Sequence, residues 1–111
     1  MSRPIPKKLL IHNATHKYNP DTDSWGNATY EGENNLTRIR IEPTTKRVIS
    51  KDNTEVQLTS TLFYDCVNSK PQNVTFAIED EILFNGTKYK VQSIEPLYDE
   101  NSLHHYEIGL V

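Results

Sequence analysis

The four histidines of this 111-residue chain are the side chains best suited to binding a metal ion. His12 and His16 stand four residues apart, which along a strand separates them by ~13 Å, too far for one metal ion. His104 and His105 are adjacent, and neighbouring side chains on a strand point to opposite faces. At most one of the second pair could join a site, so the sequence predicts no metal centre.

Cys66 is the single cysteine, and it has neither a glycine-rich elbow nor a histidine close to it in sequence. A nucleophile needs an adjacent base and a site for the oxyanion, and neither can be identified. The acidic run Glu79-Asp80-Glu81 is expected to be a solvated loop. With no phosphate-binding loop and no serine-centred elbow, the sequence predicts a protein without enzymatic activity or cofactor. A small hydrolase that uses Cys66 or His105 stays open as an alternative, provided that these residues meet in a pocket.

Three large aromatic residues fall in or beside predicted loops, where the core does not require them. They are Trp25, Tyr30 and Tyr98. Aromatic side chains in the loops of a small polar domain are typical anchors of protein interfaces. The three residues are therefore candidate interface residues, and the alternative is that they cap the open ends of a barrel.

The composition indicates one domain with a modest core. Only 35% of the residues are hydrophobic, which suggests that partners supply part of the burial, and the net charge of −3 argues against a dedicated nucleic-acid binder. An OB-like nucleic-acid-binding module would need basic and aromatic residues to converge on one barrel face. No segment is apolar enough for a signal peptide or a membrane span, so an intracellular protein with no membrane partner is expected.

The alternation of apolar and polar residues predicts an all-β fold, a small single-domain antiparallel β-barrel or barrel-like sandwich with little or no helix. Asn85-Gly86 predicts a tight hairpin turn between apolar runs at residues 82–84 and 89–94, and residues 105–110 add a third strand. A bulge near Pro96 is expected to turn Ile94 inward. Other strands are expected at residues 8–18, 28–30, 36–41 and 56–64, the last being the longest. The expected core residues are Ile39, Ile41, Leu58, Leu62, Val91 and Ile108.

The polar stretches between these runs predict loops. Residues 19–24, 31–35 and 65–73 are rich in turn-forming residues. Residues 44–55 read as a long loop or as a weak hairpin that turns at Lys51-Asp52-Asn53. Residues 1–7 hold two prolines and predict an extended arm, which a neighbouring subunit would order, so the barrel occupies residues 8–111.

Several segments together carry a resemblance that covers nearly the whole chain. They are PIPKKLLIH (4–12), WGN (25–27), RIEP (40–43), LFYDC (62–66), NSKP (68–71), VQSIEPLYD (91–99) and HHYE (104–107). This combination resembles the minor capsid, or head–tail joining, proteins of tailed phages and prophages of Gram-positive bacteria. None of these segments is catalytic or diagnostic by itself.

The resemblance implies a head-closure, or stopper, protein of the virion. Such a protein forms a homo-oligomeric ring beneath the portal and adaptor, closes the DNA exit channel after packaging and offers a platform to the tail. It is expected to be a monomer in isolation, to contact portal, adaptor and tail proteins in the virion, and to meet DNA only transiently. It would be made in the bacterial host cytoplasm and end at the head–tail interface. Another tail-tube or tail-completion protein is the structural alternative.

The resemblance also implies that a loop between two barrel strands reaches into the channel. The best match is the polar segment of residues 43–55, whose candidate channel residues are Lys46, Arg47, Val48, Ile49, Lys51 and Asp52. Its nearly balanced charge would let copies pair, so the segment is expected to be mobile in the monomer and ordered in the ring. A plain surface hairpin is the alternative for this segment, and residues 65–73 are the next candidate for the plug.

Overall fold

The computed structural model describes residues 3–111, apart from the side chain of Ala28. Met1 and Ser2, the start of the predicted arm, lie outside the described residues. The elements are η1 (Lys7–Leu9), a single turn of 3₁₀ helix, and the strands β1 (His12–Thr22), β2 (Ala28–Pro43), β3 (Arg47–Ile49), β4 (Glu55–Gln57), β5 (Ser60–Asp65), β6 (Glu81–Phe84), β7 (Thr87–Tyr98) and β8 (Leu103–Leu110).

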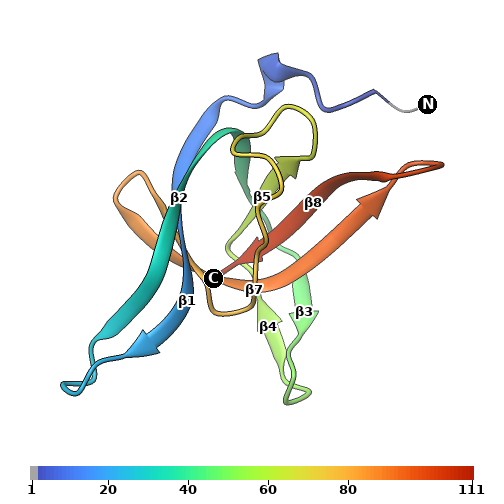
Figure 1. The fold of residues 1–111 in the computed structure, drawn as a ribbon. Helices are drawn as coiled ribbons and strands as arrows, with labels where there is room; N and C mark the ends of the chain where they lie inside the picture. The colour runs from blue at the N-terminus through green and yellow to red at the C-terminus, as the bar shows by residue number, and fades with distance from the viewer. Residues whose placement is uncertain (1–2) are drawn as a thin grey trace.

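Six of the strands form a closed antiparallel barrel in the order β1-β2-β5-β8-β7-β6 (Figure 1). β3 and β4 pair with each other in a separate two-stranded sheet. Among the described residues the only helix is the three-residue η1. The prediction of a small all-β domain with little or no helix is confirmed.

The core residues predicted from the alternation are all buried, which confirms that prediction. They are Ile39, Ile41, Leu58, Leu62, Val91 and Ile108. Val74 and Phe76, from the segment between β5 and β6, also join the buried cluster. Phe76 packs edge-on against Tyr64, with ring centroids 5.4 Å apart. This segment therefore contributes to the core although it is not a strand.

β6, β7 and β8 form the meander predicted from the C-terminal third of the sequence. Asn85 and Gly86 adopt φ values of 50° and 78°, the positive angles that the predicted tight turn requires. Ile94 packs against the core, as expected. β7 has two register shifts, one between Val91 and Ser93 and one between Leu97 and Tyr98, so a bulge lies beside Pro96 as expected and another precedes Ile94.

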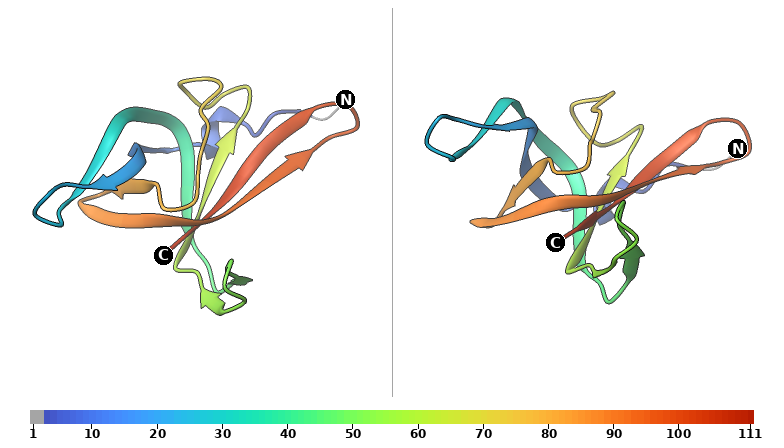
Figure 2. Two further views of the ribbon diagram at one scale, coloured as in Figure 1. Left: turned by 60° about the horizontal axis from the view of Figure 1, so that its bottom comes forward. Right: turned by 90° about the horizontal axis from the view of Figure 1, so that it is seen from below.

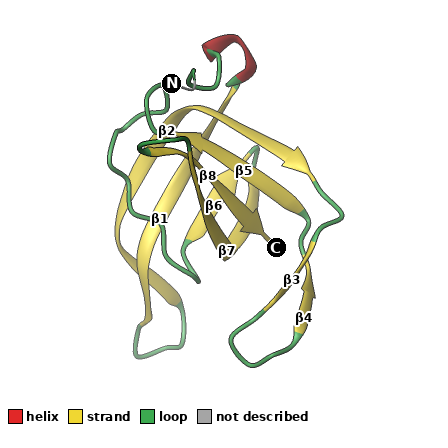
Figure 3. Ribbon diagram, turned by 90° about the vertical axis from the view of Figure 1, so that its right-hand side faces the viewer, coloured by secondary structure: helices red, strands yellow, loops and turns green. Residues whose placement is uncertain are grey.

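The ends of the first two strands differ from the prediction. β1 starts at His12, because residues 7–9 form η1, and it continues through Asn19 to Thr22. β2 is the longest strand at 16 residues, and it includes the polar break predicted at residues 31–35. Residues 18–22 and 28–32 form a ribbon that extends away from the barrel (Figure 3), whereas residues 33–35 pair with the part of β1 that also pairs with β6 in the barrel. Polar residues can continue the strand because the backbone hydrogen bonds between strands do not depend on side-chain type.

The long strand predicted at residues 56–64 is divided in two. β4 ends at Gln57 and β5 begins at Ser60. The backbone N–H of Leu58 donates to the carbonyl of Lys46, whereas the N–H of Thr59 donates to that of Leu110. The strand is interrupted because the chain changes its pairing partner here, from the small hairpin to the barrel.

Three hairpins project from the barrel and give the molecule extents of 50 × 30 × 25 Å. The tip of the β1–β2 ribbon and the tip of β7–β8 lie at opposite ends, and the β3–β4 hairpin leaves the barrel between them (Figure 2). The N-terminal segment lies beside the β7–β8 hairpin, where a ring nitrogen of His104 contacts the carbonyl of Arg3 (2.5 Å). The N-terminal segment is thus remote from the β1–β2 tip.

Candidate functional site

Trp25 stands at the tip of the β1–β2 ribbon on a turn held by hydrogen bonds. The carboxylate of Asp23 accepts the backbone N–H groups of Trp25 and Asn27, both at 2.9 Å. These bonds, with Asn27 the stronger influence, lower the pKa of Asp23 from its ordinary 3.8. Gly26, with a φ of +82°, lets the chain close the turn and donates to the Asp23 carbonyl. The turn fixes the backbone while 87% of Trp25 is exposed.

The other two candidate interface aromatics lie elsewhere. Tyr30 is half-buried on β2, and its hydroxyl lies 3.5 Å from a carboxylate oxygen of Glu81. Burial, and then the charge of Glu81, raise the pKa of Tyr30. Tyr98 is exposed at the end of β7, at the opposite end of the molecule from Trp25. The three aromatics therefore do not form one surface, and their role in binding stays a prediction.

The candidate channel segment is a hairpin, the conformation that the sequence left as the alternative. β3 and β4 pair through three residue positions. Ser50 N–H donates to the carbonyl of Thr54, and Asn53 takes a φ of 66° in the turn. The Asp52 carboxylate accepts the Ser50 hydroxyl and the Thr54 N–H, and these bonds lower the pKa of Asp52. The tip is therefore a defined turn.

Most charges of this hairpin have partners within the chain. Arg47 pairs with Glu55 across the two strands at 3.1 Å, and Lys46 pairs with Glu95 on β7. In the described part of the chain, no carboxylate is in ion-pair distance of Lys51. Its neighbour Ile49 is exposed, whereas Val48 and Val56 are half-buried. Lys51 and Ile49 are thus the residues of this hairpin best placed to meet another molecule.

The N-terminal segment is fastened to the barrel by the buried carboxylate of Asp65. One oxygen of this carboxylate accepts the N–H of Ile5 (2.9 Å). The other accepts the N–H groups of Val67 (3.0 Å) and Asn68 (2.7 Å). The Asn68 side chain completes the connection by donating to the Ile5 carbonyl at 2.8 Å. Residues 3–9 are consequently held in place by contacts within the same chain.

A buried histidine–carboxylate pair lies where the sequence predicted only a solvated acidic run. Nε2 of His16, on β1, is 2.8 Å from Oδ2 of Asp80, which also accepts the N–H of Ala77. Asp80 and Glu81 are both buried, so the expectation of a solvated loop is wrong for them. The pair joins the segment before β6 to the barrel wall. No local pattern indicated this pair, because the two residues are 64 positions apart in the sequence.

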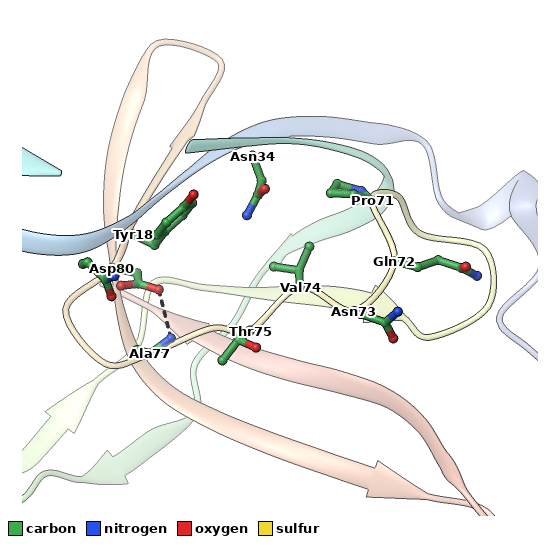
Figure 4. A pocket seen from close by; sticks show the side chains of 10 residues that line it. Tyr18, Asn34, Pro71, Gln72, Asn73, Val74, Thr75, Ala77 and Asp80 are labelled. Atoms are coloured by element: carbon green, nitrogen blue, oxygen red, sulfur yellow. Dashed lines mark hydrogen bonds between the residues drawn. The ribbon is translucent and has the colours of Figure 1, made fainter. Parts of the chain in front are cut away.

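Asp80 also borders a cavity of about 360 Å³, drawn in Figure 4. The cavity lies between β1, β2 and residues 71–80, and its lining is mostly amide, hydroxyl and small apolar groups. The lining residues are Tyr18, Asn19, Asn34, Pro71, Gln72, Asn73, Val74, Thr75, Ala77 and Asp80. Within residues 3–111, no group of three His, Cys, Asp or Glu side chains could hold a metal ion.

Cys66 and His105 do not meet in a pocket. Cys66 borders a cavity between β5, β8 and residues 73–75, whereas His105 borders a cavity under the N-terminal segment. Burial, and secondarily the charge of Asp65, raise the pKa of the Cys66 thiol, which disfavours the nucleophilic thiolate. The condition set for the hydrolase alternative is not met by this arrangement.

Residues 6–110 match the family described as minor capsid protein, which is nearly the whole chain. The chain belongs to the minor capsid protein family of phages. No match was found among curated proteins. Family membership supports a structural role in a phage virion for this chain. No helix in the described part of the chain is long and apolar enough to cross a membrane.

Proposed function

We propose that this minor capsid protein is a head-closure protein. In this role copies of the chain form a ring beneath the portal and adaptor, close the DNA exit channel and present a platform to the tail. The observation that carries the proposal is the β3–β4 hairpin, which projects from a closed barrel without supplying a strand to it. A rigid barrel can pack into a ring while the hairpin reaches toward the axis.

The hairpin has the properties that a movable plug requires. A two-stranded sheet is marginally stable by itself, and this one pairs through only three positions. We therefore expect the hairpin to be mobile in the isolated chain and ordered once its copies meet. Ile49 supplies an apolar contact for that meeting. The overall charge of −3 keeps the attraction of the ring to passing DNA weak, because that attraction is electrostatic.

The test removes the hairpin and leaves the barrel intact. Residues 47–57 are replaced by a two-residue Asn-Gly turn, which joins Lys46 to Leu58 at the point where their backbones are hydrogen-bonded. The barrel should keep its strand signal in circular dichroism, and electron microscopy with portal and adaptor should still show a ring. Packaged DNA should leak from tail-less heads. Lys88→Ala, at an exposed position of β7, is the control that should leave the heads sealed.

The other outcomes assign the function differently. Heads that stay sealed place the plug elsewhere, with residues 65–73 as the next candidate. A wild-type chain found along the tail instead of beneath the portal identifies a tail-completion protein. Strong, salt-dependent binding of DNA by the purified chain supports the OB-like alternative.

A further inference from the structure

The β1–β2 ribbon ends in an acidic tip that presents one large aromatic side chain. From residue 18 to residue 37 the chain contains Asp21, Asp23, Glu31 and Glu33 and no lysine or arginine. Trp25 projects from the middle of this segment on its hydrogen-bonded turn. A tryptophan so exposed is the residue type most enriched among binding hot spots. Because the turn is already ordered, docking it costs little conformational entropy.

The N-terminal segment forms the opposite kind of surface. A largely apolar cavity of about 420 Å³ lies between this segment and strands β2, β5 and β8, within the ~300–1,000 Å³ range of sites that hold small ligands. Beside it, Leu9 and Ile11 are 45% and 62% exposed. Its lining residues are Ile5, Leu9, Leu10, Arg40, Glu42, Phe63 and His105. The adjoining chain is basic, because residues 3–11 contain Arg3, Lys7 and Lys8 and no acidic residue.

The tip of the β1–β2 ribbon and η1, which adjoins this cavity, lie on opposite sides of the molecule (Figure 1), so a chain cannot satisfy one with the other. We propose that Trp25 of one copy docks in the N-terminal cavity of the next copy, with the acidic tip against its basic rim. Such a contact is head-to-tail, and repeated around an axis it closes a ring. The inference names the subunit contact of the proposed ring and so rests on the proposed function.

The cavity has groups suited to an indole. Nη1 of Arg40 donates to the carbonyl of Leu9 at 2.9 Å, and its Nε pairs with Glu42. These contacts hold the guanidinium at the cavity wall, where it can lie over the face of an aromatic ring. Phe63 and His105 are stacked beside it, with ring centroids 6.4 Å apart. Arg40 and this aromatic pair offer both a cation and flat apolar surfaces to an inserted tryptophan.

Lys7 and Lys8 give the rim of the cavity a positive charge that selects an acidic partner. Both are exposed on η1, next to the cavity-lining Leu9, and carry the charge opposite to that of the ribbon tip. Complementary charges at a rim steer the approach and exclude like-charged partners more than they add affinity. Another part of the same virion could reach the cavity, but the ribbon tip of a second copy presents an aromatic side chain to an apolar cavity and the opposite charge to its rim.

The experiment uses two single-cysteine variants in a Cys66→Ser background. Ser24→Cys and Leu9→Cys chains, both of which keep Trp25, are mixed and mildly oxidised, free in solution and assembled with portal and adaptor. We expect a disulfide-linked pair of the two variants to dominate. The control mixes Ile49→Cys with Leu9→Cys, because Ile49 is also exposed but lies on a different hairpin. Cross-linking of the control as strong as that of the test pair overturns the proposal.

A charge-swap series tests the rim. Trp25→Ala should weaken self-association, measured by sedimentation, on the order of 100-fold, as expected for a hot spot. Asp21→Lys and Lys8→Glu should each weaken it, and mixing the two variants should restore one of the contacts. If Trp25→Ala abolishes binding to the portal but leaves self-association unchanged, a different virion protein occupies the cavity and the proposal is wrong.

The two proposals fail in different ways. A ring seen beneath the portal without the Ser24→Cys to Leu9→Cys cross-link rejects the subunit contact and retains head closure. Cross-linked oligomers that do not bind portal and adaptor retain the subunit contact and reject head closure.

Discussion

The buried carboxylate of Asp65 should stabilise the fold and hold the N-terminal segment, and the variant Asp65→Asn tests this role. Asp65 is 0% exposed and accepts three backbone N–H groups, from Ile5, Val67 and Asn68. Asparagine has the same shape, but one of its two terminal groups is a donor. Wherever the amide nitrogen lies, at least one backbone N–H loses its acceptor and faces another donor.

The geometry decides which contact is lost. One carboxylate oxygen serves Ile5 alone, whereas the other serves Val67 and Asn68. The asparagine should therefore keep its oxygen toward Val67 and Asn68 and turn its amide nitrogen toward Ile5. A lost charge-assisted hydrogen bond and a buried donor left without an acceptor cost about 2–3 kcal/mol. The reverse orientation would strand two donors and cost roughly double, so the loss should fall on the N-terminal segment.

The assay combines unfolding in urea with limited digestion by trypsin. Asp65→Asn should lower the free energy of unfolding by that amount and speed cleavage after Lys7 and Lys8, because the segment is no longer held at Ile5. Asp99→Asn is the matched control. Asp99 also accepts two backbone N–H groups, from Asn101 and Ser102, but in an exposed turn where water can replace it. If the two variants unfold at the same urea concentration and residues 7–8 stay protected, the reasoning about the buried carboxylate is refuted.

Two further predictions concern the barrel itself. Val91→Ala should lower the free energy of unfolding in urea by on the order of 2 kcal/mol, because Val91 is 1% exposed. Val67→Ala, at a position that is 55% exposed, should lower it far less. Equal losses would contradict the assigned core. Burial raises the pKa of Tyr64 above its ordinary 10.0. The unfolded chain therefore ionises first, so the free energy of unfolding should fall as the pH rises above 10.0, and Tyr64→Phe should make that fall shallower. An unchanged slope in the variant would show that Tyr64 does not contribute to it.

The barrel could be predicted from the sequence because alternation reports a strand with one buried face. Leu58, Ser60, Leu62 and Tyr64 alternate in sequence and are all buried, although the strand itself is interrupted. The same rule explains where the prediction failed. Residues 31–35 do alternate in exposure, but their half-buried positions hold Gly32 and Asn34 and no large apolar residue. Asn34 lies beside the buried His16, so the predicted break is a strand whose inward positions are not apolar.

The sequence could not predict the polar contacts that join distant segments. His16 and Asp80 are both ordinary surface residue types, and only the pairing of β1 with β6 brings them together. The Asp65 contact with Ile5 likewise spans 60 positions. For the candidate site, the exposure of Trp25 and Tyr98 agrees with their prediction as interface residues, whereas Tyr30 is half-buried beside Glu81. The exposure of a side chain in a turn can be predicted from the residues around it. A contact between residues far apart in the sequence cannot be predicted in this way.

The low hydrophobic content and the acidic net charge acquire a different meaning once they are placed on the fold. The barrel encloses a buried core despite the low hydrophobic content. The charge is divided unevenly. Residues 18–37 carry four acidic residues and no basic one, while all twelve basic residues and the other eleven acidic ones lie elsewhere, which leaves the rest of the chain at +1. A net charge of −3 therefore describes a chain that is acidic at one end and slightly basic over the remainder. Copies of such a chain attract one another head to tail and repel one another tip to tip, and that preference favours the polarity that a closed ring requires.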